Sequence, residues 1–213
     1  MPHRRGLFTS AQTSGSTVVH LAMKHLQYAP PGRPRPADST PRRARPPRRG
    51  PLMLSALILL RHVAAESADR LTDAQSRRAW ALADFLQLYN PTNLLSGPGS
   101  ACAETLGPLA GRLGLQSTRS PDLACDAPKL TPAHAAVWLG ARALRALPDP
   151  RRTTVVCAEG PVLAALLVAV AALDGHDLAH HAQEPADALA PGGGWVLHRD
   201  DGRLVDVKPL SVR

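Results

Sequence analysis

Two residues able to do chemistry close the first apolar segment of the sequence. Residues 54–60 read LSALILL, and Arg61 and His62 follow directly. A neutral imidazole can attack phosphorus, and a neighbouring guanidinium can hold phosphoryl oxygens in a bidentate grip. The pair therefore suits phosphoryl transfer. A histidine at this place can also be a buried residue at the end of a strand, bonded to the backbone.

The elements that would position this pair alternate along the chain. Apolar runs predict strands at 54–60, 93–96 and 153–158, with an edge strand at 115–117. Helical spacing and cap residues predict helices over 72–89, 101–113, 131–147 and 160–173, and a turn at 199–203 predicts a final hairpin. This order predicts an α/β fold, a three-layer αβα sandwich with a mostly parallel sheet. Ligands bind beyond the carboxyl ends of such strands, so chemistry is expected just after Leu60, Leu95 and Cys157.

The excess of positive over negative charge is concentrated in the first quarter of the chain. The 213 residues carry a formal net charge of +8, and residues 1–52 hold ten Lys/Arg against one acid, Asp38. Residues 30–51 are rich in proline and arginine and are not expected to fold alone. We therefore expect residues 1–52 to be a disordered leader and residues 53–213 to form one domain.

The role of this leader is open at the level of sequence. It could be a mis-assigned start, a dispensable tail, a transit peptide, or a basic arm that contacts polyanions by releasing counterions. Aromatic side chains do not interleave with its arginines, which disfavours stacking on nucleic-acid bases.

Cysteine and histidine spacing argues against a metal centre and against disulfides. Cys102, Cys125 and Cys157 are odd in number and lack paired C-x-x-C spacing, which favours a reducing compartment, the cytoplasm. His176, His180 and His181 could bind a metal but have no second ligand pair nearby. No metal and no cofactor are expected. No apolar run reaches the roughly 18 residues needed to span a bilayer, so no membrane contact is expected.

Four blocks of sequence, in order, carry a resemblance to a known family. They read LLRHVA at 59–64, CAETL at 102–106, VVCAEG at 155–160 and GGGWVLH at 192–198. Together they resemble the histidine phosphatase superfamily, and within it the short bacterial phosphohistidine phosphatases, over about residues 54–210. The resemblance implies a phosphoglycerate-mutase-like fold and hydrolysis of a phosphoric monoester or phosphohistidine through a phosphohistidine intermediate.

The family's site residues are only partly present. His62 falls on the nucleophile and Arg61 on the arginine that binds phosphate. Ala101 stands where a second arginine is expected, and Glu159 stands where a second histidine is expected. The position of the acid that protonates the leaving group holds Cys125, with Asp126 next to it as a doubtful substitute.

These changes predict a large loss of phosphate binding. A charge-assisted hydrogen bond contributes about 1.5–3 kcal/mol, and two unit charges about 4 Å apart interact by roughly 4 kcal/mol at an effective dielectric constant of about 20. We therefore expect a pseudo-phosphatase with little or no turnover. The alternative is a weak phosphatase that acts on a phosphoprotein or a small phosphate ester, with Glu159 as an acid–base group. Glu159 could also be merely a favourable acid at a helix start.

Overall fold

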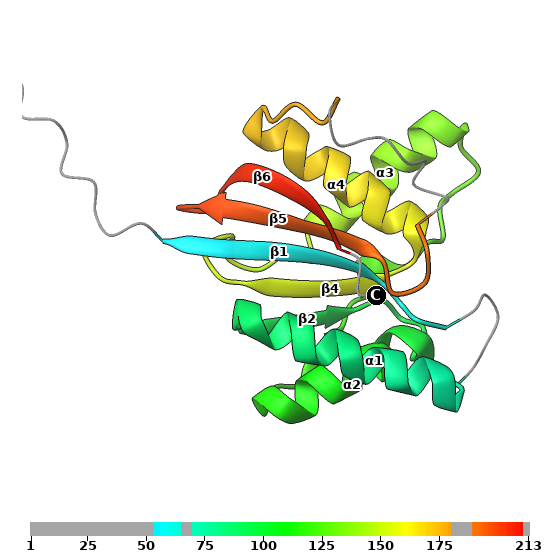
Figure 1. The fold of residues 1–213 in the computed structure, drawn as a ribbon. Helices are drawn as coiled ribbons and strands as arrows, with labels where there is room; N and C mark the ends of the chain where they lie inside the picture. Colours follow the sequence, from blue (N-terminus) through cyan, green and yellow to red (C-terminus); the bar gives the residue numbers. More distant parts are fainter. Residues whose placement is uncertain (1–52, 65–69, 180–188, 211–213) are drawn as a thin grey trace, which may run out of the picture. The chain divides into compact units, whose positions relative to one another are not determined.

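The computed structural model describes residues 53–64, 70–179 and 189–210 (Figure 1). The expected leader, with its expected disorder and polyanion contact, lies outside these residues, as do His180 and His181. The strands are β1 (Leu54–Arg61), β2 (Asn93–Ser96), β3 (Ser117–Arg119), β4 (Thr154–Ala158), β5 (Gly194–Asp200) and β6 (Arg203–Leu210). The helices are α1 (Asp73–Leu86), α2 (Ser100–Leu113), α3 (Pro132–Leu144) and α4 (Gly160–Asp174), with 3₁₀ turns at Gln87–Tyr89 and Pro121–Leu123.

One six-stranded sheet organises the fold, in the order β3-β2-β4-β1-β5-β6. The first four strands of this order are parallel, β5 runs antiparallel to β1, and β6 runs antiparallel to β5. Cys157 of β4 lies beside both Leu60 of β1 and Ser96 of β2. The carboxyl ends of these three strands therefore meet at one edge of the sheet.

Helices cover both faces of this sheet, which confirms the expected α/β class. α1 and α2 lie on one face, and α3 and α4 lie on the other (Figure 1). In β1 the alternation decides the partner of each side chain: Ile58 and Leu60 pack with α1 and α2, whereas Leu57 and Leu59 pack with the opposite layer. Because both faces are covered, the strand is continuously apolar from Ala56 to Leu60 rather than alternating.

Several expected element ends differ from the observed ones by a few residues, and two of these differences have a clear cause. The edge strand begins at Ser117 rather than 115, because the Leu115 amide still donates to the Ala110 carbonyl and closes α2 around Gly114. α3 ends at Leu144 rather than 147, because the next three amides donate to carbonyls three residues back in a tighter turn. No helix within the described ranges is long and apolar enough to cross a membrane.

Candidate functional site

His62 and Glu159 meet at the carboxyl edge of the sheet. Arg61 of β1 lies beside Ala158 of β4 in the parallel register, so the residues that follow them emerge at the same edge. Nε2 of His62 lies 3.0 Å from Oε2 of Glu159. The imidazole is almost completely buried, and the Glu159 side chain is 41% exposed. The pair therefore has one buried and one solvent-facing member.

The donor and acceptor roles in this hydrogen bond depend on the tautomer of His62. With Glu159 as a carboxylate, which accepts hydrogen bonds and donates none, Nε2 is the donor. The lone pair of the neutral ring then lies on Nδ1. That atom is buried and has no hydrogen-bond partner among the residues that the structure describes. In this state Nε2, the nitrogen beside the half-exposed Glu159, is not a free nucleophile.

Arg61 is tied to the segment that precedes β5. Its Nη1 donates to the carbonyl oxygen of Leu189. The backbone adds further bonds: the Arg61 amide donates to the Gly193 carbonyl at 2.8 Å, and the Gly192 amide donates to the Arg61 carbonyl at 3.0 Å. At least one donor of the guanidinium therefore serves the backbone rather than a ligand. Sequence reasoning missed this segment, although its three glycines were part of the fourth block.

Thr105 links the backbone of Ala101 to the backbone of Val63, the residue that follows His62. The Thr105 hydroxyl donates to the Ala101 carbonyl at 2.7 Å and accepts the Val63 amide at 3.2 Å. Val63 follows His62, so these two bonds join the first turn of α2 to the residue after the imidazole. The side chain at position 101 is a half-buried methyl group that offers no charge and no hydrogen bond.

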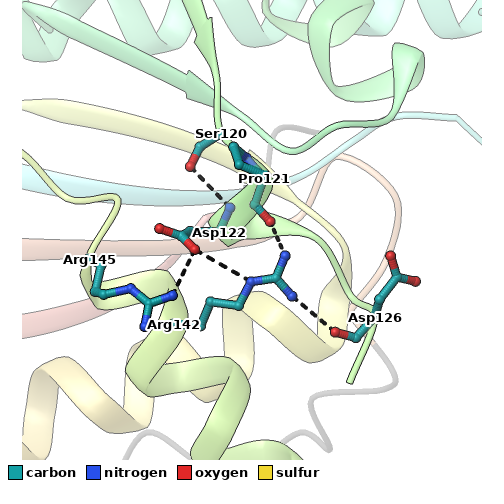
Figure 2. A network of polar contacts seen from close by, with 6 residues as sticks. All are labelled: Ser120, Pro121, Asp122, Asp126, Arg142 and Arg145. Atoms are coloured by element: carbon teal, nitrogen blue, oxygen red, sulfur yellow. Dashed lines mark hydrogen bonds and ion pairs between the residues drawn. The ribbon is translucent and has the colours of Figure 1, made fainter. Parts of the chain in front are cut away.

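Asp126 and Cys125 lie in the segment that follows the 3₁₀ turn at Pro121–Leu123. Burial raises the pKa of the Cys125 thiol, and the negative charges of Glu159 and Asp126 raise it further. Both acids therefore act on the same thiol. The expected leaving-group acid, Asp126, is bound through its backbone, and its carboxylate points away from Arg142 (Figure 2).

Arg142 of α3 holds this segment in place. Its guanidinium donates to the carbonyl oxygens of Pro121 and Asp126, the latter at 3.0 Å, and lies 3.5 Å from the Asp122 carboxylate (Figure 2). Arg145 donates to the same carboxylate at 3.0 Å. These cations keep the pKa of Asp122 below its usual value, with the Arg145 hydrogen bond as the largest cause.

We expect Arg142→Ala to lower the free energy of unfolding by about 2 kcal/mol, the cost of hydrogen bonds made by a charged group. Arg145→Ala is the matched control. Arg145 is largely exposed and makes one ion pair with Asp122, so its loss is expected to cost less than about 1 kcal/mol. Urea denaturation of both variants measures the difference. Equal losses would show that the Arg142 contacts do not secure the segment.

The thiols form no disulfide, and the acids and histidines form no metal cluster in the described part of the chain. Cys102, Cys125 and Cys157 are all free. Burial raises the pKa of the Cys157 thiol well above its usual value, which keeps it in the unreactive protonated form. No group of three or more His, Cys, Asp or Glu residues within that part could hold a metal ion.

Solved structures define the class of this fold. YhfR of Bacillus stearothermophilus is 15% identical, with a TM-score of 0.52 over 71% of this chain and 94% of that chain. The putative phosphohistidine phosphatase SixA from Nakamurella multipartitia is 20% identical, with a TM-score of 0.50 over 73% and 95%. A mycobacterial glucosyl-3-phosphoglycerate phosphatase, Rv2419c, is 20% identical, with a TM-score of 0.49 over 73% and 97%.

YhfR and SixA, the two of these neighbours with TM-scores of at least 0.50, are histidine phosphatase superfamily members. The chain therefore has the phosphoglycerate-mutase-like fold, which confirms the resemblance seen in the sequence at the level of the fold. No family model matches the sequence, and no curated protein matches it either.

Proposed function

We propose that this chain is a pseudo-phosphatase of the histidine phosphatase superfamily, with little or no phosphate turnover. The observation that supports this most is the hydrogen bond between His62 Nε2 and Glu159 Oε2. A carboxylate lies against this imidazole nitrogen and is itself partly exposed to solvent. Attack on phosphorus requires a free lone pair there, and an incoming phosphate would meet a negative charge.

The charges around the site argue in the same direction. At about 4 Å and an effective dielectric constant of about 20, a phosphate charge and the Glu159 carboxylate repel by roughly 4 kcal/mol. Solvent around the half-exposed carboxylate reduces this repulsion. A repulsion of only about 1.4 kcal/mol is nevertheless enough to weaken phosphate binding tenfold. Arg61 donates to Leu189, and Ala101 supplies no compensating cation. The site is therefore a poor binder of phosphate dianions.

A weak phosphatase is the second candidate, and one observation favours it. The Glu159 side chain is 41% exposed while bonded to His62. A carboxyl group in contact with both solvent and the imidazole could exchange protons with each and act as an acid–base group. The substrate would then be a phosphoprotein or a small phosphate ester.

The three free cysteines fit our further proposal that the protein works in the cytoplasm.

Phosphate affinity tests the proposed loss of function. We expect the full chain to bind orthovanadate and inorganic phosphate more weakly than about millimolar, and Glu159→Gln to bind them at least about tenfold more tightly, because one repulsive charge is removed. Asp201→Asn is the control. It neutralises an acid in the β5–β6 turn, at the opposite edge of the sheet. Isothermal titration calorimetry measures all three proteins. Tight binding by the unmodified chain, or no gain in Glu159→Gln, would reject the proposal.

A further inference from the structure

The outer side of α4 is apolar although no described residue covers it. From Gly160 to Leu173 the helix contains no charged residue. Its inward side is packed into the core, whereas Val168 is 59% and Leu173 is 72% exposed. A helix that is apolar around its whole circumference is usually covered on all sides.

A groove runs along this outer side, between α3 and α4. It has a volume of about 720 Å³. Its floor is formed where the helices touch, since a methyl group at Gly140 would lie only 2.8 Å from the Ala165 carbonyl oxygen. Val137 and Val168, both exposed, are among its lining residues. We call this surface the α3–α4 face. All of its lining residues are apolar: Pro132, Ala135, Ala136, Val137, Leu139, Gly140, Ala141, Leu144, Pro161, Ala164, Ala165, Val168, Ala169 and Ala172.

We propose that the α3–α4 face is the contact surface of a two-fold symmetric homodimer. In such a contact the same patch meets itself, so charged residues near the axis would meet their own like charges. A face free of charge meets this condition. The shape of the face also suits a second copy. The exposed side chains of Val137 and Val168 border a groove lined by alanine and glycine, so they can insert into the same groove of the partner.

The size of the face sets the strength of the dimer. Stable interfaces use about 20–30 residues on each side, and the groove supplies 14. Even with margin residues such as the exposed Leu130 and Leu173, the face is smaller than that range. We therefore expect a dissociation constant in the micromolar range, which corresponds to about 8 kcal/mol at 1 μM. The dimer would be visible as a change of mass with protein concentration.

Sedimentation analysis of the full chain, from about 1 to 200 μM, tests this proposal. The unmodified protein is expected to change from monomer to dimer across this range. Val168→Glu is expected to remain monomeric throughout, because each copy would then bury a charge against an apolar groove. The matched control is Val205→Glu, which places the same charge on the similarly exposed side of β6. It should associate as the unmodified chain does, and circular dichroism checks that both variants fold.

The salt dependence of the dimer distinguishes a contact through the α3–α4 face from association through the basic leader. Burial of apolar surface is not weakened by 0.5 M NaCl, whereas attraction between charged segments is screened. A dimer that persists in salt and is lost in Val168→Glu supports the proposal. A chain that stays monomeric at 200 μM, a dimer equally stable in Val168→Glu, or a dimer abolished by salt would overturn it. These outcomes do not depend on whether the site turns over phosphate.

Discussion

The double variant Ala101→Arg with Glu159→His is expected to show measurable phosphatase activity. It replaces a half-buried methyl group and a carboxylate by two groups that can donate to phosphoryl oxygens. Preorganised donors of this kind contribute about 10²–10³-fold each in rate. The change at 159 also removes the acceptor that occupies Nε2 of His62. Hydrolysis of an aryl phosphate near neutral pH measures the gain over the unmodified chain.

The single changes are expected to recover little, because groups that act together on one phosphoryl group are not additive. His62→Ala added to the double variant should abolish the gain, because the phosphoryl group would have no acceptor. Circular dichroism confirms that each variant is folded. A folded double variant without activity would contradict the view that missing charge causes the inactivity. A gain that survives His62→Ala would contradict the role of His62.

Gly194→Ala is expected to lower the free energy of unfolding by at least about 3 kcal/mol, the upper part of the range for overpacking. A methyl group there would lie 1.8 Å from the Leu59 carbonyl oxygen, which belongs to the backbone of β1 and cannot rotate away. β5 would have to move off β1, which would also disturb the backbone hydrogen bonds that Arg61 makes with Gly192 and Gly193. Thermal and urea unfolding measure the loss.

Gly111→Ala is the matched control for this substitution. Gly111 lies within α2, and a methyl group there meets nothing within 4 Å. Alanine is the better helix former, so the control should gain about 0.5–1 kcal/mol. If Gly194→Ala were as stable as the unmodified chain, the contact between β1 and β5 could not be as close as described.

The position of the site could be predicted from the sequence because it depends on pattern and order. Apolar runs that end at Leu60 and Cys157 must lie in one sheet, and parallel strands bring the residues that follow them to one edge. This reasoning led to His62 and Glu159, which the structure joins by a hydrogen bond. The resemblance added the meaning of the substitutions at positions 101 and 159, which periodicity cannot provide.

The contacts that shape the site could not be predicted in this way. Two sets of hydrogen bonds join residues from separate elements. Arg61 donates to the Leu189 carbonyl, and Arg142 donates to the carbonyls of Pro121 and Asp126. Both use backbone carbonyl oxygens as acceptors. Every residue except the terminal one presents such an oxygen, so no residue type marks the partner in the sequence.

Phosphorylation of His62 is the most direct test of the proposed loss of function. The full chain would be incubated with a small phospho-donor such as acetyl phosphate, and phosphohistidine would be quantified by mass spectrometry at neutral pH, with His62→Ala as the blank. We predict no phosphohistidine at position 62 and no aryl phosphate hydrolysis above the His62→Ala background. Phosphorylated His62 together with hydrolysis that depends on it would contradict the account and make Glu159 a working acid–base residue.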